Sequence, residues 1–179
     1  MTARHPAMDV KLLVDQHYEM LYRFAYRLSG SAAEAEDLTQ ETFCTVQAKI
    51  GQLRDPASAR GWLCKILRNH YLQGRRQPQG VLIESLENLA AEPEQIDDCP
   101  AEIDAERLQG ALAEMPEPFR VVVILFYFEE FSYRQIAVQL GVPIGTVMSR
   151  LARAKAYLRT RLRAESVALH QTDSSPGVT

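Results

Sequence analysis

The fold is decided by the sequence FSYRQIAVQLGVPIGTVMSRLARAKAYLRTRLR at residues 131–163. Ser132 is a favoured N-cap residue, and the residues that follow it have the apolar spacing of a first short helix. Gly141 accepts the left-handed conformation that ends such a helix, and Pro143 suits the first turn of the next one. The stretch therefore predicts two short helices joined by a tight turn.

The second of these helices has one apolar stripe and a basic remainder. Its apolar residues recur at intervals of three and four: Val147, Leu151, Ala154 and Leu158. From Pro143 to Arg163 there are six basic residues and no acidic one. Ala137 and Gly141 are small where the two helices would cross, which is typical of a helix-turn-helix whose second helix enters the major groove. A plain helical hairpin with a basic, solvated face is the alternative; the coincidence of turn, small residues and one-signed charge favours DNA binding.

Length and composition allow one ordinary domain or two small ones. The chain has 179 residues, and 46% hydrophobic residues can supply packed cores. No segment approaches 18 uninterrupted apolar residues and the N-terminus has no apolar signal core, so we expect a cytoplasmic protein without membrane insertion. Three cysteines, an odd number at wide spacing, favour reduced thiols over a disulfide framework.

Charge is divided into blocks that the net value of −3 conceals. Residues 1–77 hold 11 Lys/Arg against 8 Asp/Glu, residues 78–117 hold 1 against 11, and residues 118–179 hold 8 against 4. Two basic blocks separated by an acidic one predict two binding modules and a connector.

The N-terminal half predicts three helices. Residues 9–28 have a helical apolar stripe and are followed by Gly30. We expect this stripe to contain Leu12, Met20, Leu21, Phe24, Ala25 and Leu28. Ser31 and Glu34 form a capping-box pattern that opens a helix to about residue 50. Asp55, followed by a proline, opens a third helix at about 57–73.

The remaining segments complete an all-α prediction with two small helical domains, at 9–77 and 104–163. Between them, residues 78–103 are rich in proline and carboxylates, which predicts an acidic flexible linker. The apolar run VVVILFYF at 121–128 is predicted as helix, because no second strand candidate exists to pair with it. Residues 164–179 are predicted as a disordered tail.

Two stretches of this sequence resemble a known family. The segments AEAEDLTQETF (33–43) and GWLCKILRNHYLQGRR (61–76) resemble the second conserved region of bacterial RNA polymerase sigma factors. Residues 112–155, from LAEMPEPFR to RLARAK, resemble the fourth region. The chain is short and contains only these two regions, and in this it resembles the extracytoplasmic-function (ECF) group of sigma factors. The resemblance implies an alternative-type sigma factor that directs promoter recognition, melting and transcription initiation.

The resemblance implies that one helix face binds core RNA polymerase. Asp37, Gln40 and Glu41 are spaced at i, i+3 and i+4, so they share one exposed helix face. In the family this face docks on a basic coiled coil of the polymerase. Without the resemblance, a solvated acidic face would be the preferred interpretation.

The helix at 57–73 resembles the segment that opens the proximal promoter element and holds its non-template strand. Its basic, amide and aromatic side chains suit an unpaired strand. The predicted proximal-promoter residues are Arg60, Trp62, Lys65, Arg68, Asn69, Tyr71, Arg75 and Arg76. Among them Trp62 is better explained as a core wall, and Asn69 is the favoured base reader. Gln73 and Gly74 stand where the family often has an acidic residue, so the bases read stay open.

The second helix of the helix-turn-helix resembles the family's recognition helix at the distal promoter element. Met148, Ser149, Ala152 and Arg153 match base-reading positions, while Thr146 and Arg150 are placed for phosphates. Arg153 is the natural guanine reader through O6 and N7. Met148 stands where the family commonly has a basic residue and offers a base only apolar contact.

The expected partners are core RNA polymerase, promoter DNA and, by resemblance alone, an anti-sigma factor. We expect no cofactor, metal site or enzymatic activity, because the four histidines have no ligand partners at metal spacing and no phosphate loop or nucleophile motif occurs. A stand-alone dimeric helix-turn-helix regulator, with residues 9–77 as its sensor or dimerisation domain, is the alternative.

Overall fold

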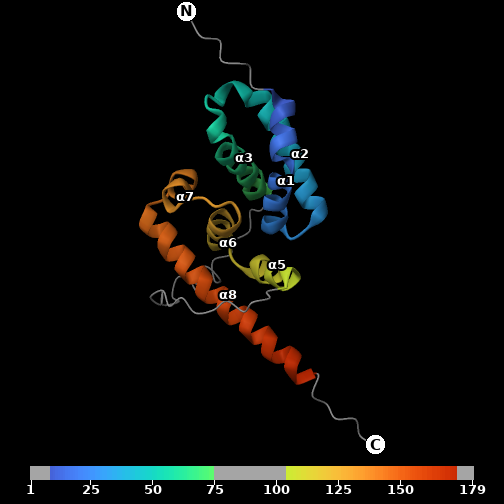
Figure 1. The fold of residues 1–179 in the computed structure, drawn as a ribbon, viewed down its shortest axis with the longest axis vertical. Helices are drawn as coiled ribbons and strands as arrows, with labels where there is room; N and C mark the ends of the chain where they lie inside the picture. Colours follow the sequence, from blue (N-terminus) through green and yellow to red (C-terminus); the bar gives the residue numbers. More distant parts are fainter. Residues whose placement is uncertain (1–8, 75–103, 173–179) are drawn as a thin grey trace, which may run out of the picture. The chain divides into compact units, whose positions relative to one another are not determined.

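A computed structural model of the chain describes residues 9–74 and 104–172, with side chains up to Arg163 (Figure 1). All regular elements in these ranges are helices, which confirms the all-α prediction. The described helices divide into two compact units, one in each half of the chain. The predicted linker at 78–103 and the residues Arg75 and Arg76 lie outside the described ranges.

The first unit begins with α1, Val10–Ser29. Asp9 caps it, because its carboxylate accepts a hydrogen bond from the Lys11 N–H at 3.0 Å. Gly30 ends it with φ 76° and donates its N–H to the Tyr26 carbonyl at 2.8 Å. Glycine reaches this left-handed conformation without steric cost, so the predicted helix end is confirmed.

The buried stripe of α1 contains Leu21, Phe24, Ala25 and Leu28, as predicted, but not Leu12. Leu12 is half exposed, at 50%, whereas Leu13 is 2% exposed. Leu13 lies within about one residue's rotation of Leu21, Phe24 and Leu28 at 100° per residue, and Leu12 is turned outward from it. The prediction for Leu12 was therefore wrong.

Helix α2, Ala32–Lys49, is the central element of the first unit and packs on both α1 and α3. The Ser31 hydroxyl accepts a hydrogen bond from the Glu34 N–H at 3.4 Å. Thr39 and Thr42 are fully buried, and each hydroxyl donates to the carbonyl four residues earlier at 2.7 Å. This internal pairing lets two hydroxyls enter a mainly apolar core.

Two short 3-10 turns, Ile50–Gln52 and Pro56–Ser58, lead into α3, Ala59–Gly74. The Asp55 carboxylate accepts from the Ala57 N–H at 3.0 Å, as the Asp-Pro signal predicts. Leu63 and Leu67 of α3 are fully buried, so this helix closes the three-helix bundle against α1 and α2.

The second unit contains α5 (Ala105–Glu114), α6 (Glu117–Val123), a π-helical turn η3 (Ile124–Phe128), α7 (Tyr133–Leu140) and α8 (Ile144–Thr172). The apolar run at 121–128 is helical, as predicted, and its residues 121–125 are at most 2% exposed. Its end widens into the π-turn, where the Glu129 N–H donates to the Ile124 carbonyl at 3.1 Å.

Helix α8 is longer than predicted and is tied to α5. It continues through Thr172, so residues 164–172 are helical where a disordered tail was expected; 173–179 lie outside the described ranges. Arg161 binds both carboxylate oxygens of Glu114, at 2.7 and 2.8 Å. Arg107 Nη2 donates to the Leu162 carbonyl at 2.9 Å. Arg161 thus connects α8 to α5 within the second unit, a role that could not be predicted from its charge alone.

Candidate interfaces for protein and DNA

The exposed ridge of α2 carries the predicted protein-binding residues. Asp37, Gln40 and Glu41 are all exposed, on the side of α2 opposite its buried Ala35 and Val46. Cys44 is also exposed and lies on the same ridge, at i+3 from Glu41 and i+4 from Gln40. Sequence reasoning did not include this thiol, although the helical spacing alone could have placed it there.

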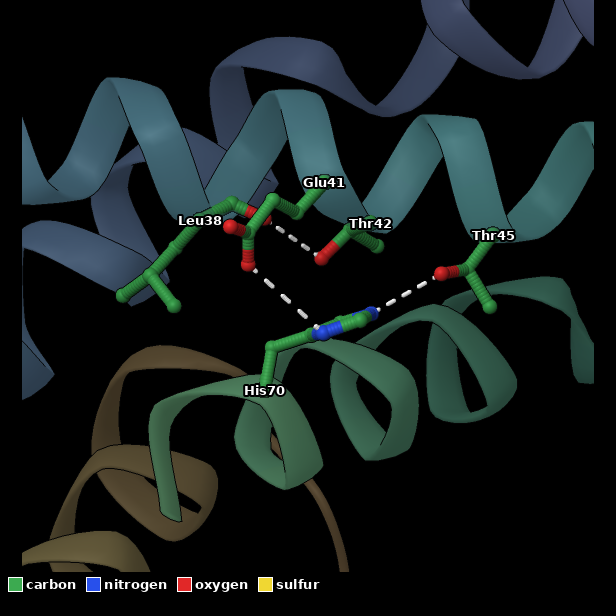
Figure 2. A network of polar contacts seen from close by, with 5 residues as sticks. All are labelled: Leu38, Glu41, Thr42, Thr45 and His70. Carbon is green, nitrogen blue, oxygen red and sulfur yellow. Dashed lines mark hydrogen bonds and ion pairs between the residues drawn. The ribbon is translucent and has the colours of Figure 1, made fainter. Parts of the chain in front are cut away.

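A polar network joins this ridge to α3 (Figure 2). His70 Nε2 lies 2.9 Å from the Thr45 hydroxyl, and His70 Nδ1 lies 3.6 Å from a carboxylate oxygen of Glu41. The histidine side chain is 24% exposed and that of Glu41 is 62% exposed. The contacts bridge residues far apart in sequence, and no local pattern predicts them.

Helix α3 presents part of the predicted strand-binding set. Lys65 and Asn69 are exposed and lie one turn apart on the same face. Arg60, Trp62 and Arg68 are partly buried. The partial burial of Trp62 is compatible with its interpretation as a core wall.

Tyr71 is a correction to the predicted site. It is only 2% exposed, so its ring is part of the core of the first unit and offers no face to an unpaired base. Tyr71 follows Leu63 and Leu67 at intervals of four, which continues the buried stripe of α3. A tyrosine ring can stack on an unpaired base, which suggested a DNA-binding role for Tyr71. Its position on the buried side of α3 places the ring in the core instead.

A charged residue of α3 influences a histidine of α1. Burial lowers the pKa of His17 from its ordinary value of 6.5, and the nearby guanidinium of Arg60 lowers this pKa further. Both effects disfavour the imidazolium, because burial removes its hydration and Arg60 adds a like charge. Arg60, one of the predicted DNA-binding residues, therefore also lies near His17 of α1.

The turn between α7 and α8 has the geometry of a helix-turn-helix. Ser132 and Gln135 form a reciprocal capping box, in which the serine hydroxyl accepts from the Gln135 N–H at 3.3 Å. The Gln135 side-chain oxygen accepts from the Ser132 N–H at 2.8 Å. Gly141 has φ 67°, and the Val142 N–H donates to the Ala137 carbonyl at 3.1 Å. The capping box thus fixes the start of α7, and the left-handed Gly141 ends α7 so that the chain can turn into α8.

The first turns of α8 separate a buried from an exposed side. Val147, Leu151 and Ala154 are at most 3% exposed, and Leu158 is partly buried. Met148 is 52% exposed. The other predicted base- and phosphate-binding residues are partly exposed: Thr146, Ser149, Arg150, Ala152 and Arg153. Helical spacing places Met148 with Ala152, and Ser149 with Arg153, along one side of α8.

Ser149 is restricted in what it can recognise. Its hydroxyl donates to the Thr146 carbonyl at 3.1 Å, so its proton is committed within the helix. The two lone pairs of its oxygen can still accept a hydrogen bond, as from a base amino group. Arg153 is therefore the strong hydrogen-bond donor among the predicted base readers, with Met148 and Ala152 apolar beside it.

The described residues contain no group of three or more side chains able to hold a metal ion. Within the same ranges, no helix is both long and apolar enough to cross a membrane.

Comparison with known proteins matches both units to the same family. Sigma-70 region 2 matches residues 13–80, and sigma-70 region 4 matches residues 105–158. The ECF RNA polymerase sigma factor SigL of Mycobacterium tuberculosis is 35% identical over 157 residues, covering 86% of this chain and 89% of SigL. SigE of Mycolicibacterium smegmatis is 40% identical over 166 residues, covering 86% of this chain but 62% of SigE.

Two solved structures have a similar fold. The sigma factor RpoE of Bartonella quintana, in complex with the anti-sigma factor NepR, has a TM-score of 0.67 and 28% identity over 86% of this chain and 96% of RpoE. CnrH, in complex with the cytosolic domain of CnrY, has a TM-score of 0.62 and 22% identity over 87% of this chain and 88% of CnrH.

Proposed function

This chain belongs to the extracytoplasmic-function sigma factors of bacterial RNA polymerase, and from that premise we propose that it binds core RNA polymerase and directs it to promoters. There it takes part in promoter recognition, melting and initiation of transcription. The observation that supports this best is that one chain contains both sigma regions, in the family's order. The alignment with SigL also covers most of both chains, 86% of this one and 89% of SigL.

The proposal divides the work between the two units. The unit at 9–77 binds polymerase through Asp37, Gln40 and Glu41. It holds the melted proximal element with α3, where Lys65 and Asn69 are the exposed members among the described residues of the predicted set. The unit at 104–163 reads the distal duplex element with the first turns of α8. The segment 78–103 connects them.

The chain acts in this proposal as a specificity subunit without enzymatic activity of its own, and it works in the cytoplasm, where polymerase and chromosome are. Because RpoE of Bartonella quintana is seen in complex with the anti-sigma factor NepR, we include an anti-sigma factor among the partners of this chain.

The test of polymerase docking uses the native thiol on the α2 ridge. Bound core polymerase should protect Cys44 from alkylation, because Cys44 lies among the docking residues. Mass spectrometry of the peptide that contains Cys44 separates its alkylation from that of Cys64 and Cys99. Asp37→Asn should weaken binding and reduce this protection, whereas Glu19→Gln, an exposed acidic change on α1, should not. Full reactivity of Cys44 in the presence of core polymerase would contradict the proposed docking face. Specific binding to promoter duplex as a dimer without polymerase would favour a stand-alone regulator.

A further inference from the structure

His70 has no predicted role, because it belongs to neither the polymerase-binding nor the DNA-binding residues named above. It projects from α3 towards the flank of the α2 ridge, where its ring lies between Glu41 and Thr45 (Figure 2). Glu41 is one of the three proposed polymerase-binding residues. The ring therefore touches the docking face from a different helix.

The two ring nitrogens have complementary partners. Nδ1 faces the Glu41 carboxylate, which can only accept hydrogen bonds, so the neutral ring is favoured with its proton on Nδ1. Nε2 then accepts from the Thr45 hydroxyl at 2.9 Å. The two contacts hold the imidazole at both of its nitrogen edges, which suits a fixed support for Glu41.

Thr45 shows how α2 is specialised at this point. Thr39 and Thr42, on the same helix, direct their hydroxyls to their own backbone at 2.7 Å. Thr45 instead lies in hydrogen-bonding distance of a side chain 25 residues away. The contact fixes the far edge of the imidazole, so that the near edge is presented to Glu41.

Glu41 benefits from such a support because it is long and mostly exposed. Its side chain is 62% exposed, and a free glutamate loses considerable rotamer freedom when it is immobilised at an interface. One carboxylate oxygen faces His70, which leaves the other for a cation of the partner. We propose that His70 is a positioning residue for polymerase docking, which holds the Glu41 carboxylate in place for a basic surface of the polymerase.

This inference rests on the proposed function, and a double-mutant cycle tests it. The affinity of the full chain for core polymerase is measured for the wild type, His70→Ala, Glu41→Gln and the double variant. An exposed pair of this kind is worth a modest energy, so His70→Ala should weaken binding by about two- to fivefold. In the Glu41→Gln background the same change should have almost no effect, because the group that it positions is already altered.

Two amide replacements separate the contacts of the ring. His70→Asn places its amide nitrogen near the position of Nδ1 and should restore binding to within about twofold of the wild type. His70→Gln places its nitrogen near Nε2, reaches Thr45 only, and should bind as weakly as His70→Ala. A purely structural role would make the glutamine and asparagine variants equivalent.

The possible failures are distinguishable. If Asp37→Asn and Glu41→Gln both leave core binding unchanged, the proposed docking face itself is wrong. If these two weaken binding but His70→Ala has no effect, or the same effect in both Glu41 backgrounds, only the role of His70 is overturned. If His70→Ala reduces the folded fraction, the affinity of His70→Asn for core polymerase decides in its place. If His70→Asn binds as weakly as His70→Gln, the proposal is contradicted.

Discussion

His17 is the residue whose protonation should couple the stability of the first unit to pH. Its pKa is lowered from 6.5 by burial and by Arg60, so the unfolded chain binds this proton more readily than the folded one. The stabilising contribution is complete above about pH 6.5 and is lost as the pH falls through the lowered pKa. We expect His17→Gln to flatten the pH dependence of urea unfolding in this range.

The measurement can be confined to the first unit. Trp62 is the sole tryptophan of the chain and lies in α3, so its fluorescence reports unfolding there. Arg60→Gln should move the pKa of His17 back towards 6.5, which NMR titration of the imidazole can follow. Identical pH profiles for the wild type and His17→Gln would refute this linkage.

Individual residues also show what sequence could predict. The exposure of Asp37, Gln40 and Glu41 was predictable because helical spacing alone puts them on one face. Tyr71 was placed wrongly, since chemistry favoured a surface role while the period of α3 buries it. The contacts of His70 were beyond prediction, because they depend on how α3 packs against α2.

At the level of elements, the helix-turn-helix contains two glycines with opposite requirements. Gly141 has φ 67°, and Gly145 lies in the first turns of α8; an added Cβ would meet nothing within 4 Å at either position. Gly141→Ala should destabilise the second unit by about 1–2 kcal/mol through backbone strain alone. Gly145→Ala should stabilise it by about 0.5–1 kcal/mol, because alanine favours helix.

Hydrogen exchange of the α7 and α8 amides in the full chain measures this difference between the two glycine variants. Equal effects of Gly141→Ala and Gly145→Ala would show that the left-handed turn is not what requires glycine at 141.

The link between α5 and α8 gives a second prediction for the elements. Hydrogen bonds from Arg161 lower the pKa of Glu114 from 4.5, and burial opposes them as the next largest effect. The charge of Arg161 and a hydrogen bond from Tyr157 add smaller lowering effects on this pKa. Glu114 is half exposed, so solvent screening limits the pair to about 0.5–1 kcal/mol despite its bidentate geometry. Arg161→Gln should lose this stabilisation.

The pair has a defined pH range and control. The stabilisation is present above pH 4.5 and is lost as the pH falls through the lowered pKa of Glu114. Hydrogen exchange in α5 should therefore quicken in Arg161→Gln at neutral pH, and high salt should narrow the difference. Arg163→Gln, a neighbouring exposed arginine, should leave α5 unchanged. Equal exchange in Arg161→Gln and the wild type would show that the pair is energetically neutral.

Helices were the most predictable level, because their ends carry local chemistry. The caps at Ser31, Asp55 and Ser132 and the turn at Gly141 stand where the sequence indicates. The π-turn after Val123 and the continuation of α8 beyond 163 were not predictable, because neither has a local signal distinguishable from ordinary helix.

At the scale of the whole molecule, the division into two helical units followed from the charge blocks and the acidic segment between them. Which partners the units bind did not follow from the fold, since helical bundles and helix-turn-helix motifs serve many functions. The proposal that the chain binds RNA polymerase comes from its family membership. The exposed residues of α2, α3 and α8 are the surfaces on which this proposal can be tested.

The most direct measurement is transcription by purified core RNA polymerase on a library of promoter sequences, with and without this chain. The chain should select a class of promoters sharing a proximal and a distal element. Asp37→Asn should lower transcription from the whole class, while Arg153→Ala should relax selection at one position of the distal element, at a cost of about 1–3 kcal/mol. If core polymerase gains no promoter selectivity from the chain, or if both variants transcribe as the wild type does, the account of a specificity subunit is contradicted.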